Sequence, residues 1–75
     1  MKRDFLIAYD YRMGGIWGLI HARSKEEIEK KYPKLIVVEQ RPKFIDDADL
    51  RWMRENRYCD IDDAPSGWFL EFAAS

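Results

Sequence analysis

A chain of 75 residues with a net charge of −1 is too short for a second domain core and too weakly charged for a dedicated nucleic-acid module. Its single cysteine, Cys59, excludes an intramolecular disulfide. The chain has many aromatic side chains (3 Trp, 4 Tyr and 4 Phe), which bury large apolar areas and so enlarge the small core of a domain of this size. We therefore predict a single domain over residues 1–75, located in the reducing cytoplasm.

Charged residues interrupt the apolar stretches throughout the chain. The beginning of the sequence, Lys2-Arg3-Asp4, lacks the continuous apolar region of a signal peptide. The charge-free run of residues 13–22 is much shorter than the about 20 residues that a membrane-spanning helix requires. The sequence predicts neither an export signal nor a membrane segment.

Two stretches with alternating apolar residues, 5–12 and 16–23, flank the pair Gly14 and Gly15. A two-residue type I′ turn needs positive φ at both of its central positions, which glycine adopts without steric cost. The sequence therefore predicts a β-hairpin that turns at this pair. With this turn, Met13 faces Ile16 and Ile7 faces Ala22.

The glycines of residues 14–18 also allow a phosphate-binding interpretation. Their order is G-G-x-x-G and a strand follows, whereas a dinucleotide site needs G-x-G-x-x-G before a helix. The Gly-Lys-Ser/Thr ending of a Walker loop is also missing. The hairpin is the better interpretation, and we predict no cofactor.

The predicted hairpin has one apolar face, which we assign to the core, and one mixed face. Gly18, on the apolar face, leaves room for a neighbouring ring or helix. The mixed face combines apolar and charged side chains in the way protein interfaces do. It carries the residues that we predict to bind a partner: Asp10, Arg12, Trp17, Leu19, His21 and Arg23. Whether a helix covers this face is left open by the sequence.

The later elements complete an α+β domain. Ser24 and Glu27 form a capping box for a helix that ends before Pro33. The β-branched residues 35–40 predict an inner strand, residues 47–57 a second helix, and residues 67–72 a closing strand. The fold class is a small two-layer β-β-α-β-α-β domain, with a mostly antiparallel sheet and two short helices on one face.

Catalytic and metal-binding groups are sparse. In the predicted register His21 lies opposite Ala8 and one diagonal step from Asp10, which makes a weak acid-base pair in a site without a pocket. The acidic residues 60–63 lack the ligand and glycine positions of a calcium loop, where Ala64 and Pro65 stand instead. We predict no metal and no enzyme activity, and we expect Cys59 to be a small buried hydrophobic residue.

The mixed face predicts a protein-binding or regulatory module, which pairs with a copy of itself or with another protein. The alternative is a single-stranded nucleic acid on the same sheet face, with Trp17 stacking on bases and Arg12 and Arg23 near phosphates. Against it, residues 44–75 carry eight acidic and only three basic side chains, which repel phosphate. The residues do not identify the partner.

Overall fold

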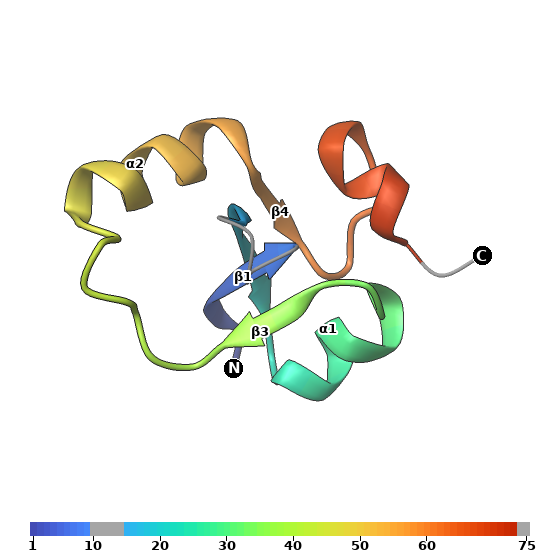
Figure 1. The fold of residues 1–75 in the computed structure, drawn as a ribbon. Helices are drawn as coiled ribbons and strands as arrows, with labels where there is room; N and C mark the ends of the chain where they lie inside the picture. The colour runs from blue at the N-terminus through green and yellow to red at the C-terminus, as the bar shows by residue number, and fades with distance from the viewer. Residues whose placement is uncertain (10–14, 74–75) are drawn as a thin grey trace.

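The computed structural model describes residues 1–9 and 15–73. These residues form a four-stranded sheet in the order β3-β1-β2-β4 with helices on both sides (Figure 1). The elements in chain order are β1 Arg3–Tyr9, β2 Ile16–Ala22, α1 Lys25–Lys31, β3 Ile36–Val38, α2 Asp47–Asn56, β4 Tyr58–Asp60 and the 3₁₀ helix η2 Gly67–Phe72. The predicted α+β class is confirmed. The sheet is mixed, because β4 runs parallel to β2 while the other pairings are antiparallel.

The hairpin is confirmed, but its register differs by four residues from the predicted one. Ile7 pairs with Gly18 rather than with Ala22, and the last pair before the connection is Tyr9 with Ile16. The predicted turn residue Gly14 lies outside the described residues. Because side chains alternate with a period of two, a slip of four residues leaves the composition of both faces unchanged.

The apolar hairpin face is closed by α1 and η2. We call it the closed face; its buried cluster contains Phe5, Ile7, Ile20, Ala22, Ile28, Tyr32, Leu35, Ile61, Phe69 and Phe72. Helix α1 begins as predicted, since the Ser24 hydroxyl accepts a hydrogen bond from the Glu27 backbone N–H at 3.4 Å. The Glu27 carboxylate accepts from the backbone N–H of Arg23 at 2.8 Å, one residue before the position of a capping box.

The predicted closing strand over residues 67–72 is wrong, because these residues form η2. In a 3₁₀ helix residues three apart share a side, and Phe69 and Phe72 accordingly point into the closed-face cluster. Leu70, which a strand would have placed beside Phe72, is 61% exposed. The remaining edge of the sheet is formed by β4, which pairs with β2.

The mixed hairpin face is covered by α2, so the two helices lie on opposite faces and the domain has three layers instead of two (Figure 1). We call this side the α2 face; its buried cluster contains Leu6, Ala8, Trp17, Leu19, Ile45 and Met53. The predicted bounds of α2 agree with the structure to within one residue. Asp46 caps its first turn, and the side chain of Asp49 bonds back to the Asp46 backbone N–H at 3.1 Å.

Strand β3 lies at the edge of the sheet, not inside it as predicted. The apolar residues 35–38 predicted an inner strand, but they pack against different elements of the fold. Leu35 and Val37 contact the closed-face cluster, Val38 contacts the α2-face cluster, and Ile36 is exposed. A run that is apolar on both faces can therefore occur at an edge when the neighbouring elements wrap around it.

Gly18 allows the chain to cross from α2 to β4. A Cβ atom at this position would lie 3.0 Å from the carbonyl oxygen and 3.2 Å from the Cβ of Arg57. The same carbonyl accepts a hydrogen bond from the Leu19 backbone N–H at 2.9 Å. The sequence predicted a neighbouring ring or helix at Gly18, whereas the structure places there the backbone of Arg57, which leads into β4.

Candidate functional site

The α2 helix decides the environment of the predicted binding residues. Trp17, which is 8% exposed, and Leu19 are buried beneath this helix and the segment that precedes it. Asp10 and Arg12 lie outside the described residues. Helix α2 thus covers the mixed face at Trp17 and Leu19, which answers the question that the sequence left open.

His21 lies opposite Asp4 rather than opposite Ala8, as a consequence of the shifted register. Its Nδ1 atom lies 2.9 Å from the Asp4 carboxylate. The Tyr58 hydroxyl donates to the same carboxylate at 3.0 Å and the Arg54 guanidinium at 3.1 Å. Burial by itself raises the pKa of Asp4, but the hydrogen bonds from these three side chains outweigh it and hold the pKa below its ordinary value.

This cluster connects four elements, β1, β2, α2 and β4. Asp4 and His21 belong to the hairpin, Arg54 to the last turn of α2, and Tyr58 to β4. The polar contacts of the Asp4 carboxylate connect these elements. His21 lines neither of the two surface hollows that flank α2. We assign the cluster a structural role, which is to fasten the end of α2 to the sheet.

Arg23 follows the last residue of β2 and belongs to a second network of ion pairs. Its guanidinium binds Glu27 at 3.0 Å and Asp62 at 2.8 Å, and Lys2 contacts both Asp60 and Asp62 at 2.7 Å. Hydrogen bonds from Arg23 and Lys2 lower the pKa of Asp62 far below its ordinary value. The acidic segment that raised the question of a metal is therefore occupied by cations of this chain.

Within residues 1–9 and 15–73, no cluster of three or more His, Cys, Asp or Glu side chains is arranged to hold a metal ion. Cys59 is half-buried against the closed-face cluster, and burial raises the pKa of its thiol. None of the helices in the described residues has the length and apolar character needed to cross a bilayer.

Two hollows in the described surface flank α2. Residues three or four apart share a side of an α-helix, so Asp49, Trp52 and Met53 face one hollow. Leu50 and Arg54 face the other for the same reason. The single helix on this side of the sheet therefore leaves a depression along each of its flanks.

The first depression, which we call the aromatic hollow, has a volume of about 320 Å³. It is lined by Gly15, Trp17, Phe44, Ile45, Asp49, Trp52, Met53 and Arg57. Phe44 is 67% exposed and Trp52 is 48% exposed. The Trp17 ring meets Phe44 edge to face, with 5.6 Å between the ring centroids. Arg57 stacks its guanidinium 4.7 Å from the centre of the Trp52 ring, which holds that ring in place.

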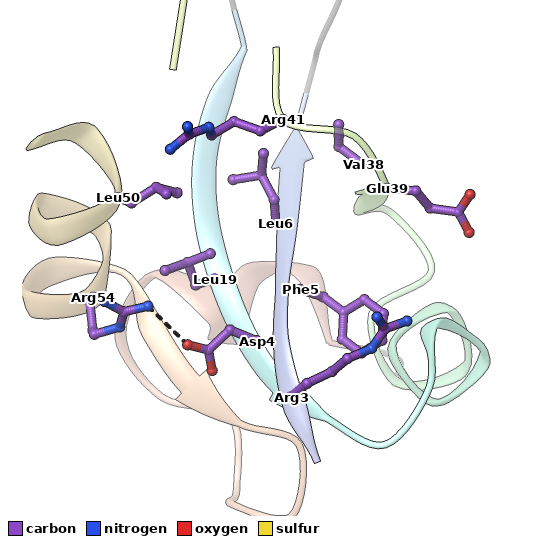
Figure 2. A pocket seen from close by; sticks show the side chains of 10 residues that line it. All are labelled: Arg3, Asp4, Phe5, Leu6, Leu19, Val38, Glu39, Arg41, Leu50 and Arg54. Atoms are coloured by element: carbon purple, nitrogen blue, oxygen red, sulfur yellow. Dashed lines mark hydrogen bonds and ion pairs between the residues drawn. The ribbon is translucent and has the colours of Figure 1, made fainter. Parts of the chain in front are cut away.

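The second depression, which we call the arginine groove, has a volume of about 400 Å³. It is lined by Arg3, Asp4, Phe5, Leu6, Leu19, Val38, Glu39, Arg41, Leu50 and Arg54. Figure 2 shows Leu6, Leu19 and Leu50 in the space between Arg41 at one end and the Arg54–Asp4 pair at the other. The groove thus has an apolar centre and charged ends.

The sequence interpretation missed the most exposed aromatics of this surface. Phe44 received no role, because it lies in the connection between β3 and α2 and belongs to no periodic element. Trp52 belongs to α2, next to the buried Met53. The available signal was its helical spacing: it stands three residues after Asp49 and away from Leu50 and Arg54.

Comparisons of this chain with protein-family models, with curated proteins and with solved structures found no match.

Proposed function

We propose that this protein is a protein-binding module and that the aromatic hollow is its contact surface. One observation carries the proposal: two large aromatic side chains, Phe44 and Trp52, stand exposed around a depression whose floor is the buried Trp17. Exposed aromatics gathered at one depression are typical of interfaces, because each ring buries a large apolar area when a partner covers it.

The chemistry of the rim supports the same function. Binding hot spots are enriched in Trp, Tyr and Arg and lie in pockets from which the partner excludes water. Here Trp52 and its stacked Arg57 form one wall, and Asp49 adds an acidic hydrogen-bond acceptor. An apolar side chain of a partner fits the centre, and polar groups beside it can pair with the rim.

The exposed rings are not needed to close the α2-face core. Ile45 and Met53 already cover Trp17 and Leu19 from above, and both are buried. Phe44 and Trp52 instead leave much of their surface in water, which costs free energy in an isolated chain. A binding surface accounts for two such residues placed side by side.

The test is a selection of random peptides displayed on phage, with wild-type protein as the target. We expect selected peptides to bind Phe44→Ala and Trp52→Ala about 30-fold more weakly, the effect of losing a hot spot of about 2 kcal/mol. Leu70→Ala is the matched control, because it removes an equally exposed apolar side chain from η2, away from the hollow. Equal binding to all three variants, or loss of binding in the control alone, would contradict the proposal.

A second copy of the chain is one partner to examine, and light scattering over a dilution series tests it. A dimer that becomes a 9.0 kDa monomer in Trp52→Ala would place self-association at the hollow. A monomer at all concentrations would direct the search to other proteins.

The free Cys59 is compatible with the proposed cytoplasmic location.

Helices cover both faces of the sheet on which bases were to stack, which favours protein binding over the nucleic-acid alternative. Titration with a single-stranded oligonucleotide at two salt concentrations tests it directly, because phosphate binding weakens steeply as salt rises. The prediction that this protein is not an enzyme remains a prediction.

A further inference from the structure

The arginine groove combines an apolar centre with a guanidinium that is only partly used. Leu6, Leu19 and Leu50 supply the centre. Arg41 donates to Asp47 through one terminal nitrogen at 2.8 Å, and this is its single hydrogen bond within the described residues. A guanidinium presents five N–H donors in a planar fork, so most of the donors of Arg41 are open to another acceptor.

The Asp47 carboxylate is a weakly held partner of Arg41. The Asp47 side chain is 91% exposed, and an ion pair in water contributes little to stability. Arg54, at the other end of the groove, is bound to Asp4, whose carboxylate also contacts His21 and Tyr58. Of these two guanidinium groups, Arg41 is therefore the one at which an incoming acid can displace a loosely held carboxylate.

We propose that the arginine groove binds a small amphipathic monocarboxylate, with its carboxylate on Arg41 and its apolar body on Leu6, Leu19 and Leu50. A volume of about 400 Å³ is within the range of about 300 to 1,000 Å³ found for small-molecule sites. A carboxylate matches the planar fork of an arginine in a bidentate arrangement. This site is separate from the aromatic hollow and extends the function beyond protein binding.

The charge of the groove restricts the ligand to a single negative group. Asp4 and Glu39 also line the groove, so a ligand with two acidic groups meets repulsion there. Figure 2 shows the Glu39 carboxylate pointing away from the apolar centre, and Lys25 binds it at 3.2 Å. A single acid at the Arg41 end avoids both carboxylates.

The experiment is a titration of the ¹⁵N-labelled protein with octanoate, followed by amide chemical shifts. We expect saturable shifts around Leu6, Leu19 and Leu50, with dissociation constants of about 1 mM for so small a probe. Octanol, which lacks the charge, and acetate, which lacks the apolar chain, should both bind more weakly than octanoate.

Variants of the ion pair give the sharpest readout. Arg41→Gln should weaken octanoate binding about tenfold, the loss expected for one charge-assisted hydrogen bond. Asp47→Asn should strengthen binding, because it removes the competing carboxylate. Arg51→Gln, an exposed arginine of α2 outside both hollows, should bind as wild type does.

The proposal is overturned if no saturable shift occurs up to about 10 mM octanoate, ten times the expected dissociation constant. It is also overturned if Arg41→Gln binds as wild type does, or if octanol binds as tightly as octanoate. Shifts confined to Phe44 and Trp52 would place the probe in the aromatic hollow, which would overturn this proposal and leave the proposed protein binding untouched.

Discussion

The two faces of the sheet are covered to different degrees. The largest fully buried side chains among the described residues, Tyr32, Ile7, Ile20 and Ile28, all belong to the closed-face cluster. The α2 face has one helix, with a hollow on each flank and exposed aromatics beside it. We therefore expect the closed face to supply most of the stability of this small domain, and we propose the α2 face as its binding surface.

The difference follows from what covers each face. Helices α1 and η2 both pack on the closed face, where Trp68 stacks within 4.7 Å of Phe72. Lys31 fastens α1 to the loop after β4 by donating to the carbonyl oxygens of Ile61 and Asp63. On the other face α2 is attached at its end by the Arg54–Asp4 ion pair, and within residues 1–9 and 15–73 no second helix packs beside it.

The largest effect is expected on the closed face. Ile20→Ala removes a fully buried side chain at the centre of the sheet, so we expect the free energy of unfolding to fall by roughly 3 kcal/mol. Urea unfolding measures this loss. A change below about 1 kcal/mol would mean that the closed face does not hold the fold.

The next largest loss of stability is expected for Gly18→Val. Its Cβ would meet the backbone carbonyl of Arg57, which cannot move without displacing β4 from β2. We expect a loss of about 2 kcal/mol, as for overpacked cores. The control is Ala22→Val on the same strand face, where any loss reports general crowding rather than contact with the Arg57 backbone. Equal losses in the two variants would contradict the role given to Gly18.

Acid should weaken the ion pairs that Lys2 and Arg23 form with Asp60 and Asp62. Hydrogen bonds from Arg23 and Lys2 lower the pKa of Asp62, and the hydrogen bond from Lys2 lowers that of Asp60. A carboxyl with a lowered pKa in the folded chain takes up protons more readily when unfolded. Its contribution to stability is therefore complete above the unfolded pKa of about 3.9 and is lost as the pH falls below it.

Urea midpoints at pH 6 and pH 3 check this expectation. Asp62→Asn should reduce the difference between the two midpoints, whereas Glu29→Gln, an exposed residue of α1 outside these ion pairs, should leave it unchanged. If Asp62→Asn kept the full difference, the Arg23–Asp62 pair would not be a source of the pH dependence.

The smallest effect on stability is expected at Trp52. The side chain is half exposed and lies on the flank of α2, so Trp52→Ala should cost less than about 1 kcal/mol. The same urea experiment used for Ile20→Ala provides the comparison. Similar losses in the two variants would remove the distinction between a stabilising face and a binding face.

The sequence predicted local structure better than the arrangement of elements in space. The caps at Ser24 and Asp46 are formed by neighbouring residues, so both helix starts could be recognised from the sequence. The composition of the two hairpin faces was also predictable, since it depends only on alternation. The register was not, because a slip by an even number of residues preserves that alternation.

The proposed binding surface was harder to predict, because it also depends on how the elements are arranged in space. The sequence singled out Trp17 as a binding residue. Whether this side chain is covered depends on which face of the sheet α2 packs against. Phe44 lies in a connection without periodicity, so only the folded chain shows that it stands beside Trp17 and Trp52. The residues of the hollow come from separate segments, and no local pattern joins them.

The most direct test of the account is the amide shift footprint of a selected peptide on the ¹⁵N-labelled protein. The account predicts that the largest shifts surround Phe44, Trp52 and Trp17 on the α2 face, and that they disappear in Trp52→Ala. Shifts centred on α1 and η2 instead would contradict it, because the closed face would then be the one that binds.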